Sequence, residues 1–420
     1  MAKTKTKSQP KGKDILRSAN SRLVKSPLSK QSQRSTEDLL TEAAQLLEQS
    51  QPELALPLAE QALRQLEAER DAEQNADIDT LLQLAAQGKT TLPEALLVKA
   101  EIELALGEGD SARKNFSRAA QIDRNGALVS AEPWLWLAQL CEEGGRESIS
   151  YFEKGTEVLR NEIDVLEDDD AQALSETTSI LDEKRAKLAD TLCAMAEVYM
   201  TDLSWEEDAE QKCETFVTEA VAVCPDYLSA GVLQTLASVR ISQERMDDAR
   251  QALRRSMEIW KDIPTDTESS SRPDFATRVS LGRLLMEVEA EPEAMTVIEG
   301  LTREDDQSVE CWYLGGWCQV LISQKPGTTS EEQTKSQEKA KKWLDDCLRL
   351  YRLQEYEDDR LRDHALELVQ GLNKSLGVED QMDDDDAWED EEEDEGDEDG
   401  DVEVDEDGLS GDQDRDVEMT

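Results

Sequence analysis

The stretch STEDLLTEAAQLLEQSQPELALPLAEQAL, residues Ser35 to Leu63, decides the fold. Its apolar residues return every three or four positions on both sides of Gln51 and Pro52. This spacing predicts two helices joined by a turn, which together form a helical hairpin. Aromatic residues make up only 4% of the 420 residues and charged residues 34%, so a quasi-linear stack of such hairpins is favoured over one large compact core.

Small residues in this hairpin follow a spacing of twelve, four and three residues, which can be searched for elsewhere. Four sets of residues have this spacing, namely Ala43, Ala55, Ala59 and Ala62; Ala100, Ala112, Phe116 and Ala119; Ala237, Ala249, Leu253 and Ser256; and Gly282, Ala294, Ile298 and Leu301. Looser copies surround Ala138, Ala196 and Gly315. Small residues at these positions allow the helices of a hairpin to approach closely.

This repeated spacing resembles the tetratricopeptide (TPR) repeat. Leu281-Gly282 and Leu314-Gly315 look like the Leu-Gly pair in the first helix of that repeat, and Pro225 looks like its closing proline. The resemblance implies an all-α superhelix of about seven hairpins over residues 35–376, some of them with insertions. An irregular alanine-rich α-bundle is the alternative, and the recurrence of the triple spacing disfavours it.

Charge divides the chain into three zones. Residues 1–34 carry ten Lys or Arg against one Asp, and from Glu379 to Thr420 twenty-five acids face one Arg. We expect a disordered basic arm at 1–34 and a disordered acidic tail at 377–420, because neither end has the apolar content of a packed element. The arm could serve in nuclear import, bind RNA or pair with the tail, and the tail could solubilise the protein or act as a mobile polyanion.

The net charge of −51 is not confined to the tail, since the middle of the chain carries about −36. A field of this sign repels nucleic acid and anionic membranes and attracts cations. We therefore expect a basic protein as partner, with no direct binding of nucleic acid or membrane. The sequence offers no long apolar stretch and no signal peptide, and its seven cysteines lack a CxxC pair, so we expect a soluble intracellular protein with reduced thiols.

Candidate chemical sites have simpler structural explanations. The single histidine, His364, lies in a charged helical stretch and is expected on a helix surface. Gly88-Lys89-Thr90 lacks the earlier glycine of a phosphate-binding loop and is expected to be a turn between helices. Cys311 and Cys318 share a helix face, which suits packing rather than zinc binding. We expect a non-enzymatic protein without cofactor or metal.

Three segments resemble a narrower family. YMTDLSWEEDAEQKC at 199–213, LQTLASVRISQERMDDAR at 233–250 and VECWYLGGWC at 309–318 are similar to the fungal dedicated assembly chaperones of large-subunit ribosomal protein four. The resemblance implies a superhelix that captures the basic internal extension of the newly made ribosomal protein, escorts it into the nucleus and releases it on the pre-ribosome. We also expect a monomer found in cytoplasm and nucleus, with an import receptor engaged through the client or the N-terminal arm.

Groove contacts in TPR proteins come chiefly from the first helix of each hairpin. Candidate partner-binding residues are therefore Glu197, Asp202, Glu206, Glu207, Asp208, Glu287, Asp305, Asp306, Glu310 and Trp312. For each acid the alternative is a solvated surface residue, and for Trp312 a packing residue between hairpins. A histone chaperone that combines TPR helices with an acidic tract is the alternative function. Docking of C-terminal peptides would need a basic clamp, to which only Arg240 and Arg283 come near.

Overall fold

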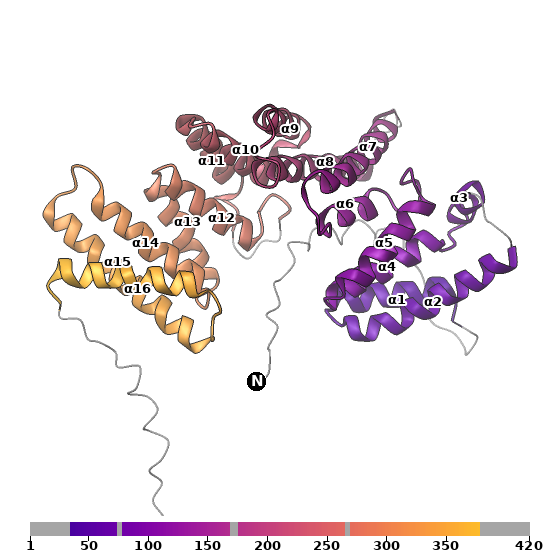
Figure 1. Cartoon of the computed structure of the whole chain (residues 1–420), viewed down its shortest axis with the longest axis horizontal. Helices are drawn as coiled ribbons and strands as arrows, with labels where there is room; N and C mark the ends of the chain where they lie inside the picture. Colours follow the sequence, from indigo (N-terminus) through magenta and orange to yellow (C-terminus); the bar gives the residue numbers. More distant parts are fainter. Residues whose placement is uncertain (1–33, 74–77, 169–174, 265–268, 379–420) are drawn as a thin grey trace, which may run out of the picture.

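The computed structural model describes residues 34–73, 78–168, 175–264 and 269–378 (Figure 1). The predicted disordered arm, apart from Arg34, and the predicted acidic tail from Glu379 onward lie outside the described residues. Within those ranges every regular element is a helix. The α-helices are α1 (Thr36–Glu48), α2 (Pro52–Glu73), α3 (Ile78–Ala86), α4 (Leu92–Ala105), α5 (Gly109–Ile122), α6 (Glu132–Gln139), α7 (Gly145–Asp168), α8 (Ser175–Met200), α9 (Ala209–Val223), α10 (Ala230–Ser242), α11 (Met246–Trp260), α12 (Phe275–Glu287), α13 (Glu291–Glu304), α14 (Val309–Gln324), α15 (Ser330–Leu353) and α16 (Asp359–Leu376).

The helices pair as seven consecutive hairpins. The pairs are α1 with α2, α4 with α5, α6 with α7, α8 with α9, α10 with α11, α12 with α13, and α14 with α15. Helix α3 lies between the first two pairs in the chain, and α16 packs against both helices of the last pair. The predicted all-α TPR-like superhelix is confirmed.

Local sequence explains where several helices begin. The side chains of Ser35, Asp274 and Ser308 each accept a hydrogen bond from the backbone N–H three residues later. Thr329 and Glu332 form a capping box at the start of α15. These side chains satisfy backbone donors that have no partner in the first helical turn.

The small residues of the repeated spacing lie at the helix contacts. All four residues of the first set, Ala43, Ala55, Ala59 and Ala62, are fully buried, and the other three sets are buried as well. Gly315 shows how close the contact is, because a Cβ atom there would lie 2.1 Å from Cε3 of Trp343 in the partner helix. The Leu-Gly pairs of α12 and α14 therefore serve the approach of the second helix.

The hairpins follow one another along an arch (Figure 1). In its central part α7, α9 and α11 lie along the outer edge, whereas α6, α8 and α12 lie nearer the inner side (Figure 1). The core runs along the arch as successive clusters between neighbouring hairpins rather than as one central mass. This is the arrangement expected when each hairpin buries its apolar face only against its neighbours.

A buried charged cluster joins α4, α6 and α8. Glu101 is 7% exposed, and the Nζ atom of Lys187 lies 2.5 Å from Oε1 of the buried Glu132. Burial and the neighbouring Glu132 raise the pKa of Glu101 to about 8, against the opposing effect of Lys187. Burial also tends to raise the pKa of Glu132, but Lys187 and Lys184 outweigh it and lower that pKa below its ordinary value. The pair is thus poised to hold one proton and one negative charge.

Two predictions about single motifs have different outcomes. Gly88 lies in the turn between α3 and α4, as expected. The expectation of a simple surface position for His364 was wrong, because its Nδ1 atom is 2.6 Å from the Tyr313 hydroxyl and its ring makes an edge contact with Trp317 at 5.3 Å. The reason is that α16 packs across α14, which half-buries the histidine. In the described part of the chain, no helix has the length and apolarity to cross a membrane.

Candidate protein-binding surface

The turn between α8 and α9 holds four of the predicted residues, and two of these join neighbouring hairpins. The Oδ2 atom of Asp202 accepts a hydrogen bond of 3.1 Å from the backbone N–H of Gly145, at the start of α7. A Cβ atom at Gly144 would lie 2.5 Å from that oxygen, so the contact requires glycine. Glu206 is almost fully buried and forms an ion pair of 2.8 Å with Arg146. Asp202 and Glu206 thus attach this turn to the preceding one.

The other two acids of this turn face solvent. Glu207 and Asp208 are both exposed, and Asp208 immediately precedes α9. Carboxylates near a helix N-terminus interact favourably with the helix dipole. Their position leaves them accessible to a cationic partner.

Glu197 belongs to a row of acids along α8. Glu183, Asp190 and Glu197 are exposed and seven residues apart, which places them on one face of the helix. Burial raises the pKa of the Cys193 thiol, and the negative charges of Asp190 and Glu197 raise it further. The sequence prediction missed Glu183 and Asp190, although their heptad spacing to Glu197 is visible in the printed sequence.

The remaining predicted residues lie around α12 and α14. Glu287, Asp305 and Asp306 are exposed at the end of α12 and in the turn before α14. Glu310 forms an ion pair of 2.5 Å with Arg283 of α12. Trp312 is half-buried, where its Nε1–H donates to the backbone oxygen of Asp306 at 2.9 Å and its ring lies 4.8 Å from that of Trp343.

These two groups do not form one site. One lies at the α8–α9 turn near the top of the arch in Figure 1, and the other lies on the arm formed by α12 to α16. The second group is itself divided, because Glu287 ends α12, whereas Asp305 follows Glu304, which forms ion pairs with Arg272 and Arg278 at the start of α12. The ten predicted residues are therefore spread over at least three places on the surface. Their contribution to binding stays a prediction.

The structure removes both cations that could have formed a carboxylate clamp. Arg240 makes a bidentate contact with Glu214, which lowers the pKa of that carboxyl below its usual value. Arg283 is held by Glu310. Because each guanidinium is already neutralised by an acid of the protein itself, neither is arranged to receive a peptide carboxylate.

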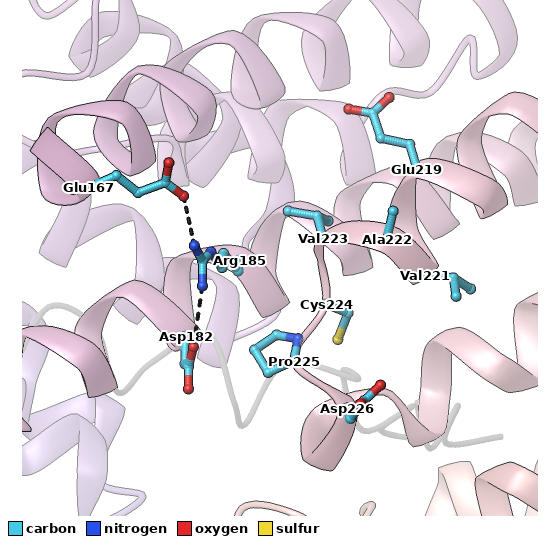
Figure 2. A pocket seen from close by; sticks show the side chains of 10 residues that line it. All are labelled: Glu167, Asp182, Arg185, Glu219, Val221, Ala222, Val223, Cys224, Pro225 and Asp226. Atoms are coloured by element: carbon cyan, nitrogen blue, oxygen red, sulfur yellow. Dashed lines mark hydrogen bonds and ion pairs between the residues drawn. The ribbon is translucent and has the colours of Figure 1, made fainter.

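A hollow of ≈ 620 Å³ opens where α7, α8 and the end of α9 meet (Figure 2). It is lined by Glu167, Asp182, Arg185, Glu219, Val221, Ala222, Val223, Cys224, Pro225 and Asp226. Its one cation, Arg185, lies between Glu167 at 2.7 Å and Asp182 at 3.8 Å (Figure 2). The hollow therefore combines an apolar wall with an excess of negative charge, which suits a cationic side chain with an aliphatic stem.

The cysteines near these surfaces are packing residues. Cys224, at the end of α9, is buried, and burial together with the charges of Asp190, Asp226 and Asp182 raises its pKa to about 12. Cys311 and Cys318 are fully buried free thiols, as their spacing predicted. Within the four described ranges no group of three or more His, Cys, Asp or Glu side chains could hold a metal ion.

Comparison with known proteins identifies the family. No protein-family model matches the chain. A protein of Emericella nidulans described as "Probable assembly chaperone of rpl4" is 42% identical over 368 residues, covering 84% of this chain and 84% of that protein. The chain belongs to this family of assembly chaperones. A member from Schizosaccharomyces pombe with the same description is 34% identical over 284 residues, covering 66% of this chain and 79% of that protein.

A solved structure agrees with this membership. The "Assembly Chaperone of RpL4 (Acl4)", residues 1–338, is 40% identical and superposes with a TM-score of 0.59, covering 69% of this chain and 97% of that one. Of the three segments that pointed to this family, 309–318 lies in α14 and is mostly buried, and 233–250 spans the buried contact of α10 with α11. Much of the family signal therefore comes from packing between hairpins.

Proposed function

We propose that this chain is an assembly chaperone of rpl4 that binds the newly made ribosomal protein and shields its basic surface. The observation that carries the proposal is the 42% identity over 84% of the chain to a protein described as such a chaperone. The electrostatics agree with it, because a chain of net charge −51 attracts a cationic polypeptide and repels RNA. No catalytic step is needed for this function.

The row of exposed acids on α8 and the exposed acids around α12 are the proposed contacts. Glu183, Asp190 and Glu197 repeat every two helical turns, so an extended basic segment could meet them in succession. Glu287 at the end of α12, and Asp305 and Asp306 before α14, would meet two further parts of the client. Each exposed pair contributes little alone, on the order of 0.2–1 kcal/mol, so affinity depends on many contacts acting together.

The same proposal extends to transport. The chaperone binds rpl4 as a monomer in the cytoplasm, enters the nucleus with it and releases it on the pre-ribosome. An import receptor engages the complex through the client or through the basic residues before Ser35. Release follows from competition, because rRNA offers a denser array of negative charge than the chaperone does.

A pull-down from native cytosol tests the proposal. The full chain, purified with a removable tag and used at moderate salt, should recover rpl4 in near-equal amount. Light scattering of the eluted complex should give the mass of one chaperone and one client. Recovery of histones in place of rpl4 would overturn the proposal and favour a histone chaperone.

A further inference from the structure

A second hollow lies along the side of α9 that is turned away from α8 and continues to the turn between α10 and α11. It has a volume of ≈ 910 Å³ and is lined by Glu207, Glu210, Gln211, Glu214, Thr215, Thr218, Glu219, Ala222, Gln243 and Arg245. We call this set of residues the α9 trough. Glu183, Asp190 and Glu197 of α8 do not line it, so it is a surface distinct from that row of acids.

The shape of the α9 trough suits a main chain. Gln211, Thr215, Thr218 and Ala222 are three or four residues apart and form one strip along the helix. Short side chains at three of these four positions leave room above the helix backbone. Helix α9 has 15 residues, which at 1.5 Å per residue gives about 22 Å, the length of roughly seven residues of extended peptide.

The charges along the trough are unevenly neutralised. Glu214 is held by Arg240, and Glu219 forms an ion pair of 2.7 Å with Arg160. Glu207 and Glu210 are exposed, and within the described part of the chain no Lys or Arg lies within 4.0 Å of either carboxylate. The basic residue of the lining, Arg245, is directed to Asp248 at 2.6 Å. The N-terminal half of the trough therefore presents uncompensated negative charge.

Trp205 lies in the turn that leads into the N-terminal end of α9. Its side chain is 75% exposed, yet its Nε1–H donates to the backbone oxygen of Asp202 at 3.1 Å, which fixes the direction of the ring. It precedes Glu207 by two residues. An indole face held in the open beside carboxylates attracts a guanidinium group more strongly than a bare apolar surface does, because the ring quadrupole and the acids act in the same direction.

We propose that the α9 trough and Trp205 bind an extended, arginine-rich segment of about seven residues from the client. This inference rests on the proposed function and assigns the client a second contact, on the outer face of the arch. Arginine is favoured over lysine because its planar group can lie on Trp205 while its stem lies along the threonines. Two contacts at different places on the central hairpins, joined by one client chain, raise the affinity by linkage.

Binding of purified rpl4 to the full chain at about 0.15 M salt tests this, with affinity measured by calorimetry. We expect Trp205→Ala to weaken binding roughly threefold and Glu207→Gln with Glu210→Gln to weaken it roughly tenfold. The matched control changes the same charge at exposed positions of other outer helices, Glu258→Gln with Glu299→Gln, and should leave the affinity within twofold. All five positions are exposed, so the fold should persist, which circular dichroism checks.

A photo-crosslinking residue at Thr218 locates the client directly. Crosslinks from Thr218 to an arginine-rich stretch of rpl4, without crosslinks from the exposed Thr296 of α13, would support the trough. Suppose that rpl4 binds the unmodified chain. Equal affinities for all variants, or crosslinks from Thr218 to residues 1–33 of the chaperone itself, would then overturn the proposal for the α9 trough. Failure of rpl4 to bind the unmodified chain would instead overturn the proposed function.

Discussion

Replacing Glu101 with glutamine should remove a pH dependence that the charged cluster builds into the first half of the arch. The carboxyl has an ordinary pKa of 4.5 in the unfolded chain and a pKa of about 8 in the folded one. Between these values the folded state keeps a proton that the unfolded state has lost, so the free energy of unfolding falls as pH rises. The slope is about 1.4 kcal/mol per pH unit, which gives a loss of roughly 2.5 kcal/mol from pH 6 to pH 8.

Glutamine has nearly the same shape and stays neutral at both pH values. The free energy of unfolding of Glu101→Gln minus that of the original chain should therefore be roughly 2.5 kcal/mol larger at pH 8 than at pH 6. Urea unfolding followed by tryptophan fluorescence measures both free energies. Glu183→Gln, at an exposed position of α8, serves as the control. Its free energy of unfolding should differ from that of the original chain by the same amount at pH 6 and at pH 8. If the difference between Glu101→Gln and the original chain were the same at both pH values, the buried proton would not exist.

Three further predictions concern packing, ion pairing and client binding. Gly315→Ala should destabilise the last hairpin by about 1–3 kcal/mol, because the added Cβ atom would lie 2.1 Å from Trp343. The control is Gly371→Ala in α16, whose Cβ atom would meet no atom within 4 Å and should not destabilise the hairpin. Thermal unfolding compares the two variants. Arg278→Lys should lower the melting temperature and raise the pKa of Glu304. The reason is that two guanidinium contacts, at 2.7 and 2.8 Å, hold the pKa of that carboxyl below its ordinary value. An NMR titration in which the pKa of Glu304 did not move would refute this. Raising salt from about 0.1 to 0.5 M should weaken rpl4 binding many-fold without unfolding the chaperone, and an affinity independent of salt would contradict an electrostatic surface.

The fold could be predicted from sequence because its rule is local and repeated. Ala43, Ala55, Ala59 and Ala62 fix one hairpin by their spacing alone, and each recurrence of that spacing repeats the same packing problem. His364 escaped prediction because its surroundings come from α14, about fifty residues earlier in the chain. A helix-surface pattern says which side of a helix is apolar, but not which neighbour later covers part of its polar side.

The candidate binding residues were harder to predict because a carboxylate has several uses in an acidic protein. Asp202 and Glu207 are five residues apart in one turn, yet the first holds the N–H of Gly145 and the second faces solvent in the α9 trough. Nothing in the residue types separates them, since both belong to a run of acids around Trp205. What separates them is the preceding hairpin, which supplies Gly145 and Arg146 to Asp202 and Glu206 and supplies no cation to Glu207. In this chain an acid is therefore available to a partner only where the neighbouring hairpin leaves its charge uncompensated, and that follows from three-dimensional packing rather than from charge density along the sequence.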